Sequence, residues 1–176
     1  MSSKKRLDRA YANAKVIPFN DSSKFILFSD CHRGDNSFAD DFASNRNIYY
    51  HALKHYFNEG FTYTELGDGD ELWENLSFDA ILNAHKNVYM LMKSFHEQER
   101  LHMIWGNHDM VYRNPAYVKK HLSTYFDAKT GEDIDLFRDI AYNEGIILKH
   151  NETGQELFLT HGHQADWWNY LFWKWS

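Results

Sequence analysis

Side chains able to bind metal ions or transfer protons gather in four short stretches of the 176-residue chain. The stretches are Asp30-Cys31-His32, Gly67-Asp68-Gly69-Asp70-Glu71, Gly106-Asn107-His108-Asp109 and His161-Gly162-His163. Taken singly, each is typical of an ordinary turn, a helix cap or a surface histidine pair. Together they offer carboxylate, imidazole and amide groups, the ligands that suit Mn, Fe or Zn. Cys31 is the single cysteine, which excludes a structural zinc site built on several thiolates.

Each of these stretches directly follows a segment that the apolar pattern predicts to be a β-strand. Strands are expected over 24–28, 61–66, 101–105, 141–149 and 156–160, with a hairpin loop between the last two. Helices are expected over 40–58 and 77–99, from Asn114-Pro115 onward and from Gln164 onward. Strands that alternate with helices predict an α/β layered fold. In such folds, reactive side chains collect in loops at the carboxyl ends of the strands.

The carboxylates of the four stretches pose an electrostatic problem if they meet at one edge of the sheet. Asp30, Asp68 and Asp109, buried together without a cation, would repel one another and lose solvation. A pair of divalent metal ions removes both costs. The sequence therefore predicts a metal site at this edge. Cys31 stands between two candidate ligands, and we expect its side chain to point away from theirs and to pack.

The bulk properties predict one soluble domain over residues 1–176, in the cytoplasm. The net charge of −6 argues against a general nucleic-acid binder, which needs a basic surface. The basic cluster Lys4, Lys5, Arg6 and Arg9 is interpreted as a solvated tail or helix face. We find no secretory signal and no run approaching the roughly 18 apolar residues of a membrane span.

The four stretches, read together, resemble the motifs of the calcineurin-like metallophosphoesterases. Asp30-Cys31-His32, Gly67-Asp68 to Glu71 and Gly106-Asn107-His108-Asp109 are similar to the first three motifs, and His161-Gly162 to the histidine-bearing fourth. The resemblance covers residues 24–166 and is specific for the family, not for a substrate. It implies a layered sheet sandwich flanked by helices, with the C-terminal part missing.

The resemblance also implies a role for each matching position. Asp30 and His32 hold one metal, Asp68 bridges both, and Asn107 and His161 hold the second. His108 stands beside the substrate phosphate as the general acid, and Asp109 orients its ring. The expected cofactors are two divalent ions, with Mn preferred over Fe or Zn. The implied activity is hydrolysis of phosphomonoesters or phosphodiesters by in-line attack of a hydroxide that bridges the metals.

Two features depart from patterns close to this one. In bacterial hydrolases that cleave a UDP-sugar lipid precursor, the fourth motif usually reads His-Gly-Asp and the third carries Arg in place of histidine. Here the residues are His163 and His108, which argues against that substrate. The family's final Gly-His-x-His motif is not found, so we expect a chain truncated before it. The aromatic segment Trp167–Trp175 is then expected to meet a hydrophobic partner surface.

The missing final motif leaves a second function open. A degenerate fold of this family could serve as a non-catalytic interaction module. Such a scaffold has no need for His108 or for Asp109. Their presence favours at least an ancestor that was an active enzyme.

Overall fold

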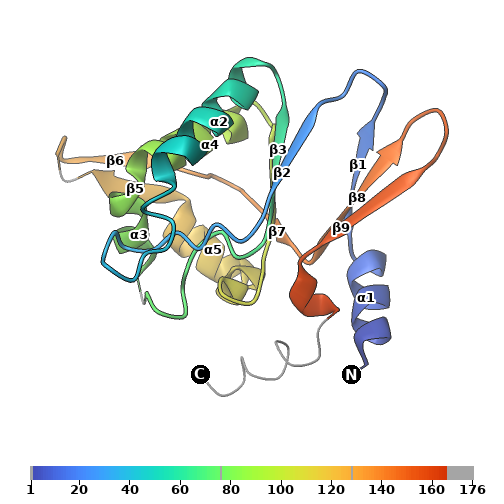
Figure 1. Ribbon diagram of the computed structural model, residues 1–176, viewed down its shortest axis with the longest axis horizontal. Coiled ribbons are helices and arrows are strands. Elements are labelled where there is room, and N and C mark those ends of the chain that lie inside the picture. The colour runs from blue at the N-terminus through green and yellow to red at the C-terminus, as the bar shows by residue number, and fades with distance from the viewer. Residues whose placement is uncertain (1, 76, 128, 166–176) are drawn as a thin grey trace.

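The computed structural model describes residues 2–75, 77–127 and 129–165 (Figure 1). Its helices are α1 (Ser3–Ala12), α2 (Arg46–Asn58), α3 (Phe78–Ala84), α4 (Lys86–Glu97) and α5 (Pro115–Leu122), with 3-10 turns at Met110–Arg113 and Gly162–Gln164. The strands are β1 (Lys15–Phe19), β2 (Phe25–Phe28), β3 (Thr62–Leu66), β4 (Leu101–Ile104), β5 (Thr124–Asp127), β6 (Glu132–Asp135), β7 (Tyr142–Asn143), β8 (Gly145–His150) and β9 (Glu156–Thr160).

These strands form two larger sheets and a separate hairpin. The four-stranded sheet has the order β2-β3-β4-β7 and is parallel throughout. The three-stranded sheet has the order β1-β8-β9, with β1 parallel and β9 antiparallel to β8. Strands β5 and β6 pair with each other. The fold is thus mixed α/β with helices flanking the sheets, in agreement with the predicted class.

Each face of the four-stranded sheet buries its own apolar core. On one face, Ile104 of β4 packs with Ile146 and Leu148 of β8, so the two sheets share a core. On the other face, Tyr63 of β3 belongs to a larger core that includes Phe95 of α4. Figure 1 shows the same layering, with α2 and α4 on one side of the central strands and β1, β8 and β9 on the other.

Two predicted helices have different bounds in the structure. The helix expected over 40–58 begins at Arg46, because Asp40 instead organises the preceding loop and accepts hydrogen bonds from the backbone N–H of Phe42 and Ala43. The helix expected over 77–99 is divided into α3 and α4. The division falls at His85, whose buried side chain forms a 2.7 Å hydrogen bond to Asp40.

The predicted strand over 141–149 is also divided in two. Its first part, β7, pairs with β4, whereas β8 pairs with β1 and β9 in the other sheet. The chain therefore crosses from one sheet to the other at Glu144. The apolar pattern over 141–149 cannot reveal such a crossing, because β7 and β8 are both strands.

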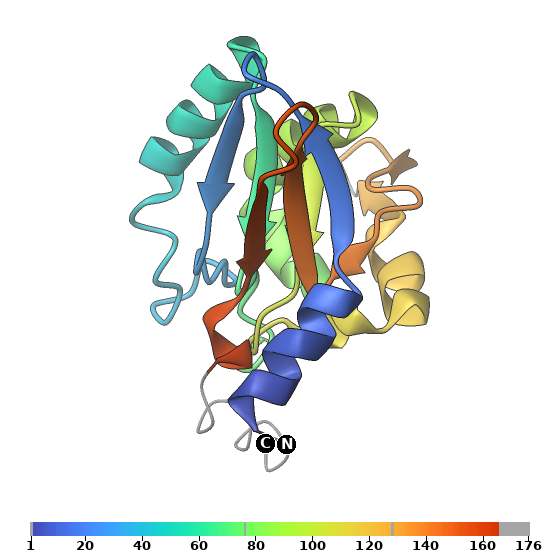
Figure 2. The same cartoon turned by 90° about the vertical axis from the view of Figure 1, so that its right-hand side faces the viewer.

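The N-terminal segment corrects one interpretation of the sequence. The basic cluster lies mainly on α1, but Arg6 is fully buried and its Nε donates a 3.0 Å hydrogen bond to the Gln164 carbonyl. Lys4 remains exposed and pairs with Asp8. Figure 2 shows α1 beside the turn that follows β9, which places it near the end of the described chain. Part of the cluster is thus structural rather than solvated.

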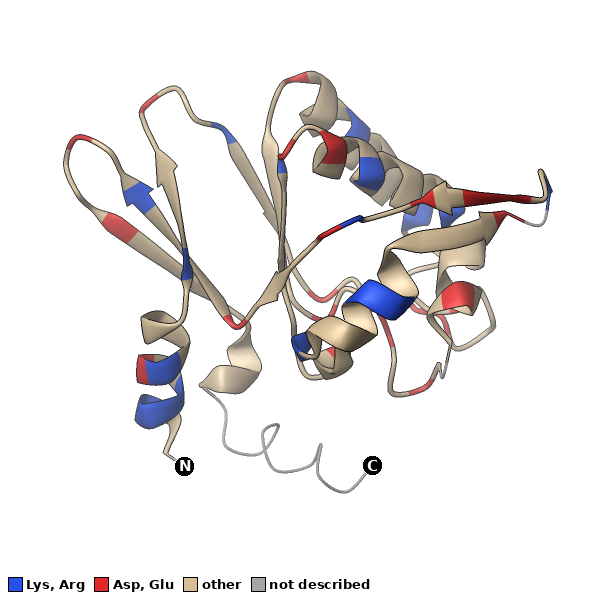
Figure 3. Cartoon of the chain, turned by 180° about the vertical axis from the view of Figure 1, so that it is seen from behind, with Lys and Arg blue, Asp and Glu red and all other residues tan. Residues whose placement is uncertain are grey.

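Several expectations concern charge, membrane insertion and the C-terminus. In the view of Figure 3, Lys and Arg are spread over several elements rather than gathered into one basic patch. Within the described residues, no helix has the length and apolar character needed to cross a membrane. The aromatic segment Trp167–Trp175 and most of the helix expected from Gln164 lie outside the described residues. Gln164 itself ends a 3-10 turn.

Candidate metal centre

The candidate site lies where the parallel strands β2, β3 and β4 end. Their common direction places the loops that follow them at one edge of the sheet, as expected from the sequence. Backbone hydrogen bonds join the first two loops: Asp30 N–H donates to Gly67 at 3.1 Å, and His32 N–H donates to Asp68 at 2.9 Å. The pairing of β2 with β3 thus continues into the two loops that follow them, and this pairing fixes the positions of the candidate ligands.

Three candidate ligands have the left-handed backbone conformation that residues other than glycine seldom adopt. The φ angles are 55° at Asp30, 49° at His32 and 52° at Asp68. Such conformations carry strain of about 1–3 kcal/mol each and cluster at functional sites. At Asp30 and His32, the backbone hydrogen bonds to Gly67 and Asp68 stabilise this strained conformation.

Glycine is required where the third loop approaches the second. A Cβ built on Gly106 would lie 2.0 Å from the Asp68 Oδ1 atom, far inside a van der Waals contact. Gly67 has φ 95°, and a Cβ there would lie 2.8 Å from the His161 Nδ1 atom. Any larger residue at either position would displace Asp68 or His161.

The loops enclose a pocket of about 470 Å³. Six of the seven residues expected in the site line it, and the remaining lining residues are Trp73, Gly162 and His163. The expected residues in this pocket are Asp30, His32, Asp68, Asn107, His108 and His161. Asp109 is the one expected residue that does not line it. Side chains up to 131 positions apart, from Asp30 to His161, thus meet in one pocket, and His161 comes from the end of β9 in the other sheet.

Among the described residues, two groups have the spacing of metal ligands, and Asp68 belongs to both. One group is His32, Asp68 and His108; the other is Asp30, Asp68 and His161. In each group, one donor atom per residue lies within 4.8 Å of the others. Asp30 is also 4.0 Å from the His32 Nε2 atom, so it lies between the two histidines.

The histidines His32 and His161 are oriented by hydrogen bonds through Nδ1. His161 Nδ1 donates to the Leu66 carbonyl at 2.8 Å, and His32 Nδ1 donates to Glu71 at 2.9 Å. With Nδ1 bonded in this way, the Nε2 atom of each ring faces Asp68. The distance from Nε2 to Asp68 Oδ2 is 3.2 Å for His161 and 4.0 Å for His32. This arrangement is typical of metal-ligating histidines, whose second nitrogen is held by a carbonyl or carboxylate.

The carboxylate of Asp68 is the centre of the pocket's electrostatics. Its Oδ1 accepts a 2.8 Å hydrogen bond from the His108 backbone N–H, which leaves Oδ2 facing the histidines. Burial raises the pKa of Asp68, but the interaction with His161 outweighs burial and brings the pKa below its usual value. For His161, burial lowers the pKa, and the hydrogen bond to Asp68 reverses that shift. Asp68 is therefore ionised at neutral pH.

Glu71 is a site residue to which the sequence analysis gave no role. Its Oε2 accepts hydrogen bonds from Nδ1 of both His32 and His108, at 2.9 and 2.6 Å. Burial raises the pKa of Glu71, but the bonds from His108 and His32 outweigh it and lower the pKa to about 2. The sequence placed Glu71 in the second stretch, next to the candidate ligands, but its spacing did not indicate that it would hold two histidines.

Asp109 has a different position from the one expected. Its two carboxylate oxygens accept hydrogen bonds from the backbone N–H of Gly106, at 2.6 Å, and of Gly69, at 2.9 Å. The expectation that Asp109 orients the His108 ring is therefore wrong, and Glu71 has that position. Burial raises the pKa of Asp109 to about 7, against the hydrogen bond from Gly106. Asp109 ties the second loop to the third from behind the pocket.

Aromatic contacts fix the ring of His108 from two sides. Trp73 stacks on it with ring centroids 3.9 Å apart and planes 24° apart, and His32 meets it edge-on at 4.5 Å. Trp73 is 41% exposed at the side of the pocket. Stacking on Trp73 fixes the plane of the His108 ring, and the hydrogen bond to Glu71 fixes its rotation within that plane. The ring is therefore oriented before any ligand enters.

His163 adds a second buried imidazole beside His161. It is 2% exposed, and burial lowers its pKa to about 4, so the ring is neutral at physiological pH. Its ring lies 5.2 Å from both Trp105 and His161. The Nδ1 atom is buried without a hydrogen-bond partner among the described residues.

Comparisons with models of protein families, with curated proteins and with solved structures found no match for the chain. The resemblance to metallophosphoesterases thus rests on the motifs alone.

Proposed function

We propose that the chain is a dinuclear metal-dependent hydrolase of phosphate esters. One observation carries the proposal: a single buried carboxylate, Asp68, belongs to two groups with the spacing of metal ligands. A carboxylate shared by two such groups could contact two ions at once, and two ions side by side are suited to an in-line displacement at phosphorus.

The donor set fits a pair of divalent ions of the Mn, Fe or Zn type. Asp68 would contact both ions, and the resemblance implies Asp30 and His32 for one ion and Asn107 and His161 for the other. The spacing instead groups His32 with His108 and Asp30 with His161 around Asp68. The Nε2 atoms of His32 and His161 face Asp68, and their Nδ1 atoms are held by Glu71 and the Leu66 carbonyl. Such ions supply Lewis acidity toward phosphoryl oxygens and lower the pKa of water.

His108 is the best placed proton donor in the pocket. Its Nδ1 donates to Glu71, which leaves Nε2 as the nitrogen available to a substrate. The carboxylate of Glu71 compensates the charge of a protonated ring, and Trp73 fixes the plane of that ring. We therefore propose that His108 protonates the departing alkoxide, with Glu71 as the positioning residue.

The test is metal-dependent turnover of two aryl esters, 4-nitrophenyl phosphate and bis(4-nitrophenyl) phosphate. The protein is stripped with a chelator and assayed before and after reloading with Mn²⁺. We expect hydrolysis of at least one ester only after reloading. Absence of turnover in a protein that binds Mn²⁺ would contradict the proposal and favour the non-catalytic interaction module.

The proton-donor role has its own test in the leaving group. An aryl oxide departs without help, whereas an alkoxide needs a proton. His108→Ala should therefore slow an alkyl phosphate far more than 4-nitrophenyl phosphate, with general acid catalysis worth about 10²–10⁴-fold. Equal slowing of both esters would rule out a proton transfer from His108.

A further inference from the structure

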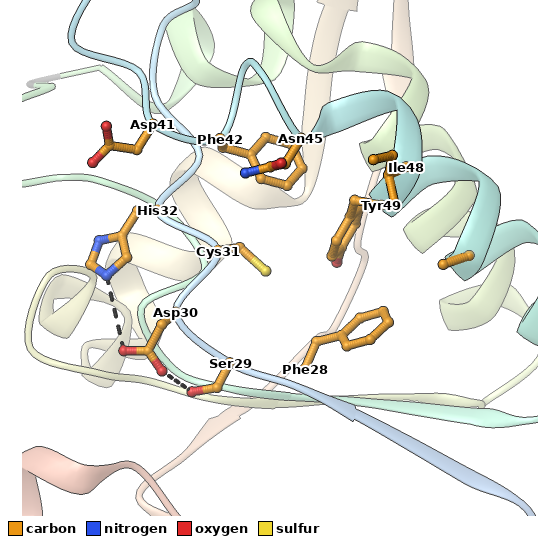
Figure 4. A pocket seen from close by; sticks show the side chains of 11 residues that line it. Phe28, Ser29, Asp30, Cys31, His32, Asp41, Phe42, Asn45, Ile48 and Tyr49 are labelled. Atoms are coloured by element: carbon orange, nitrogen blue, oxygen red, sulfur yellow. Dashed lines mark hydrogen bonds and ion pairs between the residues drawn. The ribbon is translucent and has the colours of Figure 1, made fainter.

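A second pocket borders the pocket that holds the candidate metal ligands, which we call the metal pocket. The two pockets share two lining residues. The second pocket has a volume of about 560 Å³ and lies between the end of β2, the loop that follows and the first turns of α2. Asp30 and His32 line both pockets. Figure 4 shows Cys31 pointing into the second pocket, toward Tyr49 and Phe28, while the Asp30 and His32 side chains point away from it. This confirms that Cys31 faces away from the candidate ligands.

The floor of this second pocket is apolar, whereas Ser29, Asp30, His32, Asp41 and Asn45 are its polar lining residues. The apolar side chains include Phe28, Cys31, Phe42, Tyr49 and Ala52. The hydroxyl of Tyr49 is already bonded to Tyr63 at 2.7 Å, so its ring is the part presented to the pocket. Burial raises the pKa of the Cys31 thiol to about 12, which keeps it neutral. A charged ligand group would find no partner among these five side chains.

The loop that forms one wall is held in place before a ligand binds. Asp40 accepts hydrogen bonds from the backbone N–H of Asn36 at 2.8 Å and of Phe42 at 3.0 Å, and from His85 at 2.7 Å. Phe42 is 4% exposed and belongs to the main core. Ile48, by contrast, is 75% exposed at the pocket. The pocket is thus preformed at its floor and open at its rim.

We propose that this apolar pocket receives the alkyl or aryl group of the phosphate ester whose phosphate lies in the metal pocket. The proposal rests on the hydrolase function proposed above. A substrate with its phosphate at Asp30 and His32 is already at the wall of the second pocket, because both residues line it. The volume falls within the range of about 300–1,000 Å³ that ligand pockets occupy, and such pockets are mostly apolar. Hydrolysis would release the apolar alcohol and inorganic phosphate.

The test compares two esters whose alcohols are similar in acidity, ethyl phosphate and n-hexyl phosphate, in the Mn²⁺-loaded protein. Four additional methylene groups that enter an apolar pocket should raise kcat/KM about tenfold or more. Ala52→Phe fills the pocket from α2 and should bring the ratio of the two kcat/KM values toward one. Lys54→Phe adds the same ring on the exposed side of α2 and should leave the ratio as in the wild type.

A binding measurement separates this proposal from the hydrolase proposal. By calorimetry, n-hexylphosphonate should bind at least about tenfold more tightly than ethylphosphonate, and Ala52→Phe should remove the difference. If no ester is turned over but the binding difference appears, the hydrolase is wrong and the apolar site stands. Equal affinities and equal kcat/KM values would overturn the apolar site and leave a protein side chain as the alternative occupant.

Discussion

Two charged clusters lie back to back at the end of the four-stranded sheet, and they differ in how their charges are satisfied. The core cluster consists of Arg33, Glu65 and Asp70 with the hydroxyls of Tyr63, Tyr89 and Tyr112. The pocket cluster consists of Asp30, Asp68 and Glu71 with His32, His108 and His161. Neighbouring residues along the chain, such as His32 and Arg33, belong to different clusters.

The core cluster is complete without any ligand. Arg33 donates two 2.7 Å hydrogen bonds to Glu65 and one of 2.8 Å to Asp70, and all three side chains are at most 1% exposed. Burial lowers the pKa of Arg33, but Asp70 and Glu65 outweigh it and raise the pKa well above its usual value. The Tyr112 hydroxyl donates to the other Asp70 oxygen at 2.6 Å, and the Tyr63 hydroxyl donates to a Glu65 oxygen that also accepts from Arg33. The role of the core cluster is therefore structural.

The pocket cluster, by contrast, has carboxylates that face histidine nitrogens across an open pocket. Among the residues that the structure describes, no Lys or Arg lines this pocket. In the core cluster, the buried carboxylates are compensated by arginine and tyrosine. In the pocket the compensation is left to histidines and, in our account, to metal ions.

The largest expected effect is the loss of activity on neutralising Asp68. Asp68→Asn removes the charge shared by the two ligand groups, so Mn²⁺-dependent ester hydrolysis should fall by about a thousandfold or more, as for loss of a key electrostatic group. The free energy of unfolding in chelator should change by at most about 1 kcal/mol, measured by urea titration. Full retention of activity would rule out the bridging role.

Arg33→Met should produce the opposite pattern. It leaves Glu65 and Asp70 buried without their cation, which costs about 3–5 kcal/mol in the free energy of unfolding. Urea unfolding in chelator measures this loss. A variant with unchanged stability would show that the core cluster is not the structural counterpart described above.

Glu71→Gln should give an intermediate effect confined to the pocket. The amide keeps the side chain's length but loses the charge that holds His32 and His108 through Nδ1. Loss of such a supporting group lowers metal affinity or activity by about 10- to 100-fold. The matched control is Glu74→Gln, an exposed acidic residue of the same loop. Equal effects of the two substitutions would remove Glu71 from the site.

The smallest expected effect is a pH dependence of stability from the Asp40–His85 pair, whose side chains are both fully buried. Burial lowers the pKa of His85, despite the hydrogen bond to Asp40. The unfolded chain therefore binds a proton more readily than the folded one. Stability should fall as pH drops below the unfolded value of 6.5, and His85→Gln should flatten that fall. A wild-type stability that stays constant between about pH 7 and 5 contradicts this assignment.

The pocket was largely predictable because it depends on the ends of parallel strands. Strands β2, β3 and β4 have clear apolar patterns, and parallel pairing alone brings Asp30, Asp68 and Asn107 to one edge. Six of the seven expected residues line one pocket, although His161 reaches it from β9 in the other sheet, which parallel pairing does not explain. The direction of Asp109 and the role of Glu71 were not predictable in the same way. They depend on left-handed turns at Asp68 and on hydrogen bonds that no spacing rule specifies.

The parts of the fold that the sequence did not reveal depend on distant contacts. Strand β1 contains Pro18 and pairs with β8, more than a hundred residues away, so its local pattern is weak. Helix α1 is predominantly polar, and its buried arginine, Arg6, is satisfied by the Gln164 carbonyl at the far end of the described chain. The secondary-structure propensity of a short segment is local, so it cannot predict contacts with residues so distant in the sequence.

The most direct test of the account is the number of metal ions bound per chain. The protein is stripped with chelator, titrated with Mn²⁺ by calorimetry, and compared with Asp68→Asn. The account predicts two Mn²⁺ ions per chain in the wild type and loss of both in the variant. Absence of binding, or the same stoichiometry in Asp68→Asn, would contradict a centre organised around Asp68.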